Sequence, residues 1–213
     1  MGSETTKQRM QISGRSVILR TVMAFDECSD IDRVIVVSRP EEIEYMQTEL
    51  SGIQKLERIV CGGATRAESS YRGICAVGDG CDFVAIHDAA RCLITPDGIS
   101  RVVRVAKDKG AATAAVAVTN TIKRVDEAGR VVETLDRSEL LAVETPQVFG
   151  YAAIRAAFDA APSLGTEITD DNMIYERSGG DIHTVEVGCD NFKITTPRDV
   201  LLAELVLKER NNV

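Results

Sequence analysis

The feature that most constrains the fold is an alternation of short β-forming runs with segments of helical pattern. The β-forming runs lie at 33–38, 55–63, 83–88 and 111–118. Helical patterns occupy 40–50, 65–78 and the residues after Thr95-Pro96-Asp97, where Thr95 is a candidate N-cap. Strands that alternate with helices favour a mostly parallel sheet built from βα units. We therefore predict a Rossmann-like α/β fold in a single domain.

The composition limits the partners that the chain can bind. Its 213 residues are 44% hydrophobic, which suits one ordinary α/β domain. A net charge of −8 argues against nucleic acid or an anionic membrane surface as a partner, so an anionic substrate would need a local basic cluster. Because residues 1–15 are polar and no run reaches about 18 apolar residues, we expect a cytoplasmic protein.

The cysteines and histidines do not form a recognisable metal site. There is no Cys-x-x-Cys pair, and the only histidines are His87 and His183, so no zinc ligand set can be assembled. Free cysteines usually behave as small core hydrophobes, and a reduced compartment fits that role. The cysteines are Cys28, Cys61, Cys75, Cys81, Cys92 and Cys189.

Residues 121–136 depart from the α/β alternation. Two β-forming runs flank Asp126-Glu127-Ala128-Gly129, which has the composition of a tight turn. This pattern predicts a protruding β-hairpin. An isolated hairpin is marginally stable in water, so the arm is expected to pack on another surface, such as a second subunit.

The two ends of the chain differ in pattern. The C-terminal part predicts a helix over 169–180, a strand over 181–188 and a last helix from Thr196-Pro197. The N-terminal part predicts a helix over 17–27 as its first element, with no strand and no Gly-x-Gly cluster within 1–15. A doubly wound domain usually opens with a strand and a phosphate-binding turn.

Two segments at predicted strand ends carry candidate chemistry. Residues 62–66, Gly-Gly-Ala-Thr-Arg, combine backbone freedom, a hydroxyl and a cation at a helix start, which suits an anion site or equally a plain turn. In 87–91, His-Asp-Ala-Ala-Arg, Asp88 could hold a hydroxyl or a metal, or it could form an ion pair with an arginine. His87 is expected to be structural, because no nucleophile can be assembled around it.

Candidate cations lie near polar turns. Lys193 stands on a short β-like segment before the last helix, where it could face the crevice or, as is usual in a strand, the solvent. Lys7 lies in a polar segment and by itself reads as a solvated surface residue. Arg66, Arg137 and Lys193 within an acidic protein nevertheless suggest a phosphate site.

Several short blocks occur in a fixed order and spacing along the chain. They are M-G-x-x-x-x-K-Q at 1–8, G-G-x-x-R-x-x-S at 62–69, H-D-A-A-R at 87–91, N-T-I-K-R at 120–124, L-D-R-S-E-L at 135–140, T-P-Q-V-F at 145–149, I-T-D-D at 168–171 and D-N-F-K-I-T-T-P-R-D at 190–199. Together they resemble the 2-C-methyl-D-erythritol 4-phosphate cytidylyltransferase family of the non-mevalonate isoprenoid pathway. The resemblance extends over almost the whole chain.

In that family the substrate phosphate attacks the α-phosphorus of CTP, pyrophosphate leaves, and Mg²⁺ is held mainly by the CTP phosphates. The resemblance implies that the catalytic residues are Lys7, Lys193 and Arg137. It implies that the nucleotide is bound by Gly62, Gly63, Arg66 and Ser69. It implies that the polyol substrate is bound by Asp88, Ala89, Thr121, Thr145 and Thr169. A phosphate monoester, with a second pKa of about 6, is already largely dianionic, so no general base is required.

The resemblance also assigns a role to the predicted hairpin. It implies a single nucleotidyltransferase domain over 1–213, in which 119–143 is a dimerisation arm. Two such arms would interlock in a homodimer and carry Thr121 and Arg137 toward the partner's active site.

The chain departs from the family at its start. The family normally opens with a strand and A-A-G-x-G-x-R, and this chain begins immediately after that arginine, so we expect the strand, the glycine-rich loop and a catalytic arginine to be absent from it. The start could be an internal Met of a longer protein, which the cost of losing a buried strand favours. It could also mark a truncated or diverged form with weakened catalysis, or Met1-Gly2-Ser3 could be a remnant of expression.

Two other functions are open at this point. A pentitol-phosphate cytidylyltransferase, acting on ribitol or ribulose phosphate, would use the same fold and mechanism, although D-A-A-R and L-D-R-S favour methylerythritol phosphate. A truncated, non-catalytic protein that binds a nucleotide or a sugar phosphate would fit the expected absence of the loop.

Overall fold

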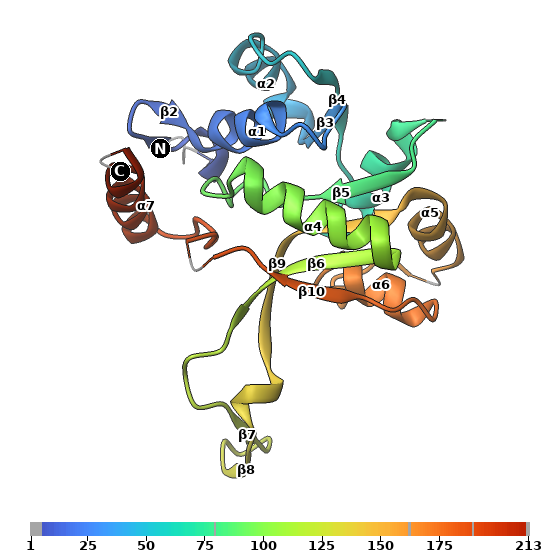
Figure 1. Cartoon of the computed structure of the whole chain (residues 1–213), viewed down its shortest axis with the longest axis vertical. Helices are drawn as coiled ribbons and strands as arrows, with labels where there is room; N and C mark the ends of the chain where they lie inside the picture. Colours follow the sequence, from blue (N-terminus) through green and yellow to red (C-terminus); the bar gives the residue numbers. More distant parts are fainter. Residues whose placement is uncertain (1–5, 79, 162, 189, 212–213) are drawn as a thin grey trace.

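A central sheet of four strands organises the chain. In the computed structural model, which describes residues 6–78, 80–161, 163–188 and 190–211, its strand order is β10–β6–β9–β5. β10 pairs with β6 in parallel, whereas β9 runs antiparallel to both β6 and β5, so the predicted α/β fold is confirmed with a mixed rather than a mostly parallel central sheet. The strands, labelled in Figure 1, are β5 (Phe83–Ile86), β6 (Ala111–Ala117), β9 (Leu141–Gly150) and β10 (His183–Glu186).

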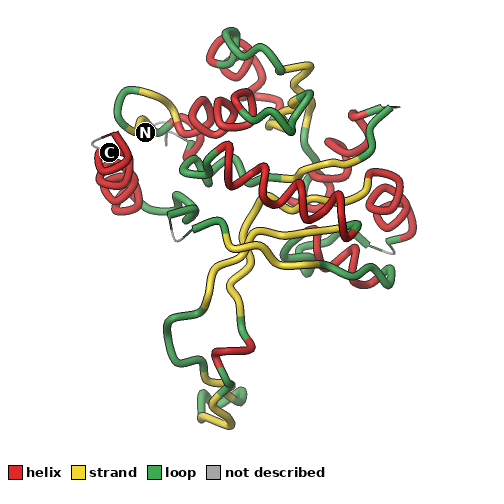
Figure 2. The backbone as a smooth tube through the Cα atoms, viewed as in Figure 1, coloured by secondary structure: helices red, strands yellow, loops and turns green. Residues whose placement is uncertain are grey.

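Helices cover both faces of this sheet because successive side chains of a strand point to opposite faces. Val148 in β9 packs toward α1 and α4, whereas its neighbour Phe149 packs toward α3, α5 and α6, and both are fully buried. Figure 2 shows these helices around the central strands. They are α1 (Val17–Glu27), α3 (Arg66–Val77), α4 (Pro96–Lys109), α5 (Tyr151–Ala160) and α6 (Asp171–Arg177).

A second, two-stranded parallel sheet stands beside the central one. β3 (Val34–Ser38) pairs with β4 (Leu56–Cys61), and the connection between them contains η2 (Pro40–Glu42) and α2 (Ile43–Glu49). In the part of the chain that the structure describes, β4 is the only sheet partner of β3 and β9 is the only sheet partner of β5. A groove of about 1120 Å³ has both β3 and β5 in its walls. Its apolar lining includes Ile35, Val37, Val84 and Ile86.

The chain between β6 and β9 forms an arm that projects from the body (Figure 1). β7 (Lys123–Val125) and β8 (Val131–Thr134) pair in antiparallel fashion within it, and η3 (Arg137–Glu139) follows. The Asp126 carboxylate accepts hydrogen bonds from two backbone N–H groups of the turn, where Gly129 adopts a φ of 78°. The predicted protruding hairpin is therefore confirmed.

The N-terminal segment corrects one prediction. We expected no strand within 1–15, but β1 (Gln11–Ile12) pairs with β2 (Arg15–Ser16) after the turn η1 (Lys7–Arg9). Ser13 and Gly14 make the reversal with φ angles of 45° and 76°. A ladder of two residues is too short to leave a period-two pattern in the sequence.

The other predicted helices and strands are confirmed, including the start of α7 (Pro197–Asn211) after Thr196, except that the β-like segment around Lys193 is not a strand. β9 and α5 were not predicted. Cys28 and Cys92 are buried as expected, Cys75 is exposed, and Cys189 lies outside the described residues. Every helix in the described part of the chain is too short or too polar to cross a membrane.

Replacing Thr95 by Ala should lower the free energy of unfolding by about 1 kcal/mol. Thr95 Oγ1 accepts a hydrogen bond from the Gly98 N–H at 3.1 Å and so caps α4, as the sequence predicted. Urea denaturation followed by circular dichroism measures this loss. Thr95→Ser keeps the hydroxyl and should lose much less, whereas equal losses in the two variants would contradict the cap.

Candidate active site

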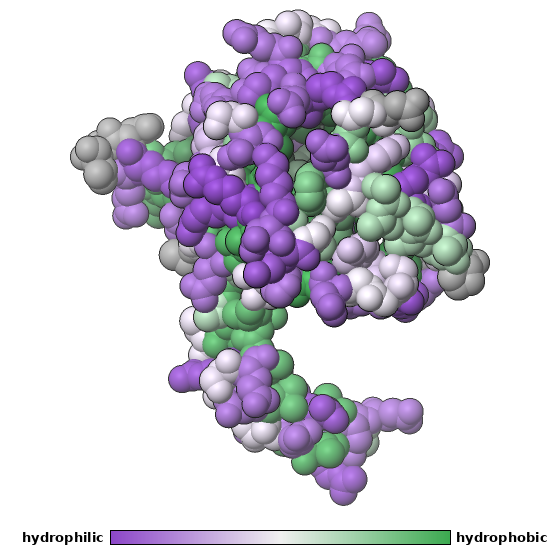
Figure 3. All heavy atoms as spheres, turned by 45° about the vertical axis from the view of Figure 1, so that its right-hand side comes forward, coloured by the Kyte–Doolittle hydropathy of each residue, from purple (hydrophilic) through white to green (hydrophobic). Residues whose placement is uncertain are grey.

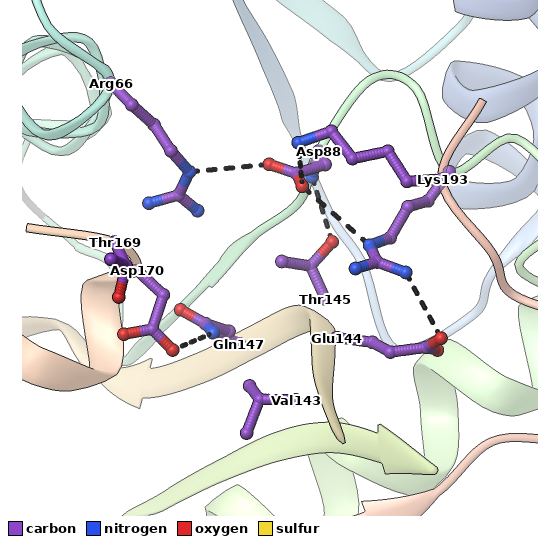
Figure 4. A pocket seen from close by; sticks show the side chains of 10 residues that line it. Arg66, Asp88, Val143, Glu144, Thr145, Gln147, Thr169, Asp170 and Lys193 are labelled. Carbon is purple, nitrogen blue, oxygen red and sulfur yellow. Dashed lines mark hydrogen bonds and ion pairs between the residues drawn. The ribbon is translucent and has the colours of Figure 1, made fainter. Parts of the chain in front are cut away.

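A polar pocket of about 190 Å³ lies beside the carboxyl end of β5 (Figure 4). Its walls come from the start of α3, the loop after β5, the middle of β9, the turn before α6 and the segment before α7. It shares Arg66, Asp88 and Lys193 with the groove that has β3 and β5 in its walls. Pockets for small molecules usually measure about 300–1,000 Å³, so this pocket suits one polar group of a larger ligand.

Asp88 is the point at which three cations meet. Lys193 Nζ donates a hydrogen bond to Asp88 Oδ2 at 2.9 Å. Arg66 Nε lies 3.5 Å from Asp88 Oδ1, and Arg91 Nε lies 3.8 Å from Oδ2. Burial opposes ionisation of Asp88, but Lys193 and Arg66 outweigh it and hold the pKa of this carboxyl below its ordinary value of 3.8. Asp88 is therefore a carboxylate at neutral pH.

The segment that carries Lys193 is fastened to β9 through a buried network. Arg91 Nη1 donates to the backbone oxygen of Asn191 at 2.8 Å and pairs with Glu144 Oε1 at 3.2 Å. Asn191 Nδ2 in turn donates to Glu144 Oε2 and to the backbone oxygen of Thr145, both at 2.8 Å. Further hydrogen bonds offset part of the cost of burying this ion pair, at Arg91 Nη1 and Glu144 Oε2, whereas the buried Arg91 Nε has no hydrogen-bond partner. The network fixes the backbone two residues before Lys193.

Arg66 lies between two carboxylates at the start of α3. Its Nη2 is 2.8 Å from Asp171 Oδ2, and its Nε is 3.5 Å from Asp88 Oδ1. Asp171 is fully buried, and burial raises its pKa while the charge of Arg66 favours the ionised form. The Arg66 side chain is 32% exposed, so it remains accessible from the pocket.

His87 is held as a neutral structural side chain. The Asp88 N–H donates to Thr145 Oγ1 at 3.0 Å, so the Thr145 hydroxyl is free to donate to His87 Nδ1, also at 3.0 Å. His87 Nε2 then carries the proton and donates to the backbone oxygen of Arg91 at 3.1 Å. Burial lowers the pKa of His87 to about 4. Both ring nitrogens therefore have partners, which fits the expected structural role of His87.

The glycine turn at 62–63 is shaped by contacts with α3. Gly63 N–H donates to Ser69 Oγ at 3.1 Å, and Ser69 Oγ donates to the backbone oxygen of Thr65 at 2.9 Å. A Cβ at Gly63 would lie 2.3 Å from Glu68 Cβ, which no real structure allows. Only glycine fits at this approach of the turn to the helix, so the turn presents backbone without side chains.

The structure brings together only part of the predicted site. Lys193, Arg66, Asp88, Thr145 and Thr169 line the pocket, while Ala89 and Ser69 line the adjoining groove next to the Gly62-Gly63 turn. The other predicted residues line neither of these cavities. They are Gly62 and Gly63 in the turn beside Ser69; Lys7, exposed on η1 beside the groove residue Gln8; and Thr121 and Arg137 on the arm. Residues 1–5 of the first block lie outside the described residues.

Several residues of the pocket were not predicted from the sequence. Arg91 closes the H-D-A-A-R block and Asp170 follows Thr169, so both stood beside predicted residues. Glu144 is a buried charge inside β9, and Gln147 Nε2 donates to Asp170 Oδ2 at 3.0 Å. Glu144 stands directly before the T-P-Q-V-F block, and this position next to a predicted site residue was the sequence signal that could have identified it.

Comparisons with known proteins agree with one another. A sequence model of the family described as 2-C-methyl-D-erythritol 4-phosphate cytidylyltransferase matches residues 1–209. The protein of that name from Alkaliphilus oremlandii (strain OhILAs) is 38% identical over 213 residues, which covers 99% of this chain and 90% of the relative. The structure of 4-diphosphocytidyl-2C-methyl-D-erythritol synthase from Anaerococcus prevotii DSM 20548 is similar with a TM-score of 0.85 at 25% identity, over 93% of this chain and 88% of that one. The cytidylyltransferase structure from Thermus thermophilus gives a TM-score of 0.77 at 29% identity, over 95% of this chain and 93% of that one.

Lowering the pH from 7 to 5 should reduce the free energy of unfolding by about 2 kcal/mol through His87 alone. The folded pKa of His87 is about 4 against an ordinary value of 6.5, so between these values the unfolded chain binds a proton that the native state excludes. Stability is therefore lost as the pH falls through this window. Urea denaturation at both pH values measures the loss, and His87→Gln should remove most of it.

His183→Gln is the matched control for this measurement, because His183 is exposed. That variant should keep the pH dependence of the natural chain. The assignment to His87 is wrong if His87→Gln retains the full loss between pH 7 and 5.

Proposed function

The chain belongs to the 2-C-methyl-D-erythritol 4-phosphate cytidylyltransferase family, and from this premise we propose that it transfers CMP from CTP to 2-C-methyl-D-erythritol 4-phosphate. The products are 4-diphosphocytidyl-2-C-methyl-D-erythritol and pyrophosphate. The observation that carries the proposal is the gathering of Arg66, Arg91 and Lys193 around Asp88 in an otherwise acidic chain. Such cations suit the recognition of phosphate groups.

The proposed reaction needs positioning rather than a base. An oxygen of the substrate phosphate forms a bond to the α-phosphorus of CTP, and the bond from that phosphorus to the bridging oxygen of the β-phosphate breaks. Pyrophosphate leaves with the electron pair. Because the attacking phosphate is already largely dianionic, no side chain has to remove a proton. His87, which is neutral and hydrogen-bonded at both nitrogens, is accordingly not needed as a base.

Lys193 is the group best placed to receive the attacking phosphate. Its side chain is 43% exposed, whereas that of its partner Asp88 is 18% exposed, so the ammonium stands on the open side of the ion pair. A phosphate dianion carries more charge than one carboxylate and can share the ammonium with Asp88. Asp88, Ala89, Thr145 and Thr169 would then surround the polyol, as the resemblance implies.

The groove beside the pocket supports a place for the nucleotide. It is the larger cavity, it adjoins the pocket at Arg66 and Asp88, and Ser69 next to the Gly62-Gly63 turn lies in its wall. Backbone groups of that turn would contact the cytidine. Lys7 is proposed to stabilise the charge at the α-phosphate, a role that remains a prediction.

The residues present fit a magnesium ion that arrives with CTP. No group of three or more His, Cys, Asp or Glu side chains in the described part of the chain could hold a metal by itself. Mg²⁺ usually keeps several waters and binds through substrate phosphates with one or two carboxylates, and Asp88 is the carboxylate at the meeting point of the two cavities. When bound, the ion would neutralise charge on the triphosphate.

We propose that 119–143 mediates a homodimer within a single nucleotidyltransferase domain over 1–213. The arm exposes Val125, Val131 and Val132 by 54%, 56% and 61%, and Figure 3 shows apolar surface along it. Apolar side chains on a projecting two-stranded arm suit a protein partner. A second copy would bring Thr121 and Arg137 to the pocket that they do not reach within one chain. The proposed location of the enzyme is the cytoplasm.

The acceptor assay tests the proposed function directly. The 213-residue chain with CTP and magnesium should release pyrophosphate with 2-C-methyl-D-erythritol 4-phosphate, with a kcat/KM at least about tenfold above that for ribitol or ribulose phosphate. Faster turnover with a pentitol phosphate would assign the alternative acceptor. Calorimetric binding of CTP without release of pyrophosphate from any acceptor would favour a non-catalytic binding protein.

Arg137→Ala should leave the protein dimeric and weaken its affinity for the substrate phosphate by roughly 10- to 100-fold, because a charge-assisted contact is lost. Arg124→Ala on the same arm is the matched control, since it removes an exposed arginine that pairs with Glu133. Light scattering measures the oligomeric state and steady-state kinetics measures KM. Unchanged kinetics in Arg137→Ala would contradict the proposed role of the arm.

A further inference from the structure

The proposed function leaves one buried charge without an assignment. Asp171 is the first residue of α6 and is 0% exposed, although a carboxylate is costly to bury. Its backbone N–H donates to Gln147 Oε1 at 3.1 Å, which ties the start of α6 to β9. Its carboxylate faces Arg66, with 2.8 Å between Oδ2 and Nη2. The carboxyl group of Asp171 therefore contacts Arg66 from the protein interior and is shielded from solvent.

The guanidinium of Arg66 has few other constraints. Nε lies 3.5 Å from Asp88 Oδ1, which is a looser contact than the one to Asp171, and the buried Nη1 has no hydrogen-bond partner. The Asp88 carboxylate also forms ion pairs with Lys193 and Arg91. The orientation of Arg66 therefore depends on the pair with Asp171 more than on any other contact that we observe.

We propose that Asp171 is a positioning residue that holds the Arg66 guanidinium at the wall of the pocket, ready for an anionic group of the substrate. This inference rests on the proposed function, because it assigns Arg66 to the binding of phosphate groups. When a substrate phosphate competes for the cations around Asp88, the contact with Asp171 keeps Arg66 in place. A buried partner 2.8 Å from the guanidinium suits this role, since water cannot compete for the contact.

A double-mutant cycle separates positioning from a general structural role. In the natural background, Asp171→Asn should raise KM for 2-C-methyl-D-erythritol 4-phosphate or CTP and lower kcat/KM about tenfold. In an Arg66→Gln background the same substitution should change kcat/KM by less than about twofold, because the side chain that Asp171 orients is gone. Equal losses in both backgrounds would overturn the proposal, and so would the absence of any loss in the natural background.

Asp159→Asn is the control variant. Asp159 also pairs with an arginine, Arg155 at 3.0 Å, but it lies on α5 and lines neither cavity. It should leave kcat and KM unchanged. Melting temperatures show whether Asp171→Asn folds, and if it does not, the cycle is run with Asp171→Glu, which keeps the charge and displaces it by one methylene.

A second measurement does not require turnover. The Arg66 Nε–H resonance, identified by its loss in Arg66→Gln, should be sharp in the natural chain and broadened or shifted to the position of a mobile arginine in Asp171→Asn. Asp159→Asn should not alter it. An unchanged resonance in Asp171→Asn would overturn the positioning role. If the natural chain shows the sharp resonance but releases no pyrophosphate, the proposed function fails while the positioning role stands.

Discussion

The ionised carboxylate of Asp88 is the interaction on which the rest of the pocket depends. It draws together a lysine from the segment before α7, an arginine from the start of α3 and an arginine from its own loop. Without a central negative charge, three cations this close would repel one another and separate. An acidic chain thereby maintains a compact group of cations that a phosphate can reach.

Arg66 and Arg91 each make a further contact with a second carboxylate, and Arg91 also donates a hydrogen bond to a backbone oxygen. Arg66 has Asp171, and Arg91 has Glu144 and the Asn191 carbonyl, all of them buried. Lys193 alone has a single acidic partner among the contacts observed, and it is the most exposed of the three cations. The two arginine side chains are therefore held in place by several contacts. The Lys193 side chain has fewer contacts and is the cation that can move to contact a substrate.

The sequence predicted the fold well because strands and helices leave periodic patterns and caps, as at Thr95. It did not predict β9, whose buried Glu144, Thr145 and Gln147 break the expected apolar run. Asp88, Arg66 and Lys193 could be chosen from their places at strand ends and helix starts. The pairing of Glu144 with Asn191 and of Arg66 with Asp171 joins residues far apart in sequence, so no local pattern could show it. The roles of Lys7, Thr121 and Arg137 were inferred from the family resemblance alone. Within a single chain these three residues do not line the pocket.

The central claim is that the cations around Asp88 receive a phosphate group through Lys193. Calorimetry with 2-C-methyl-D-erythritol 4-phosphate and with methylerythritol that lacks the phosphate tests it most directly. The account predicts that Lys193→Met weakens binding of the phosphorylated compound roughly 10- to 100-fold and leaves binding of the other unchanged. Equal affinity of the natural chain and Lys193→Met for the phosphorylated compound would contradict it.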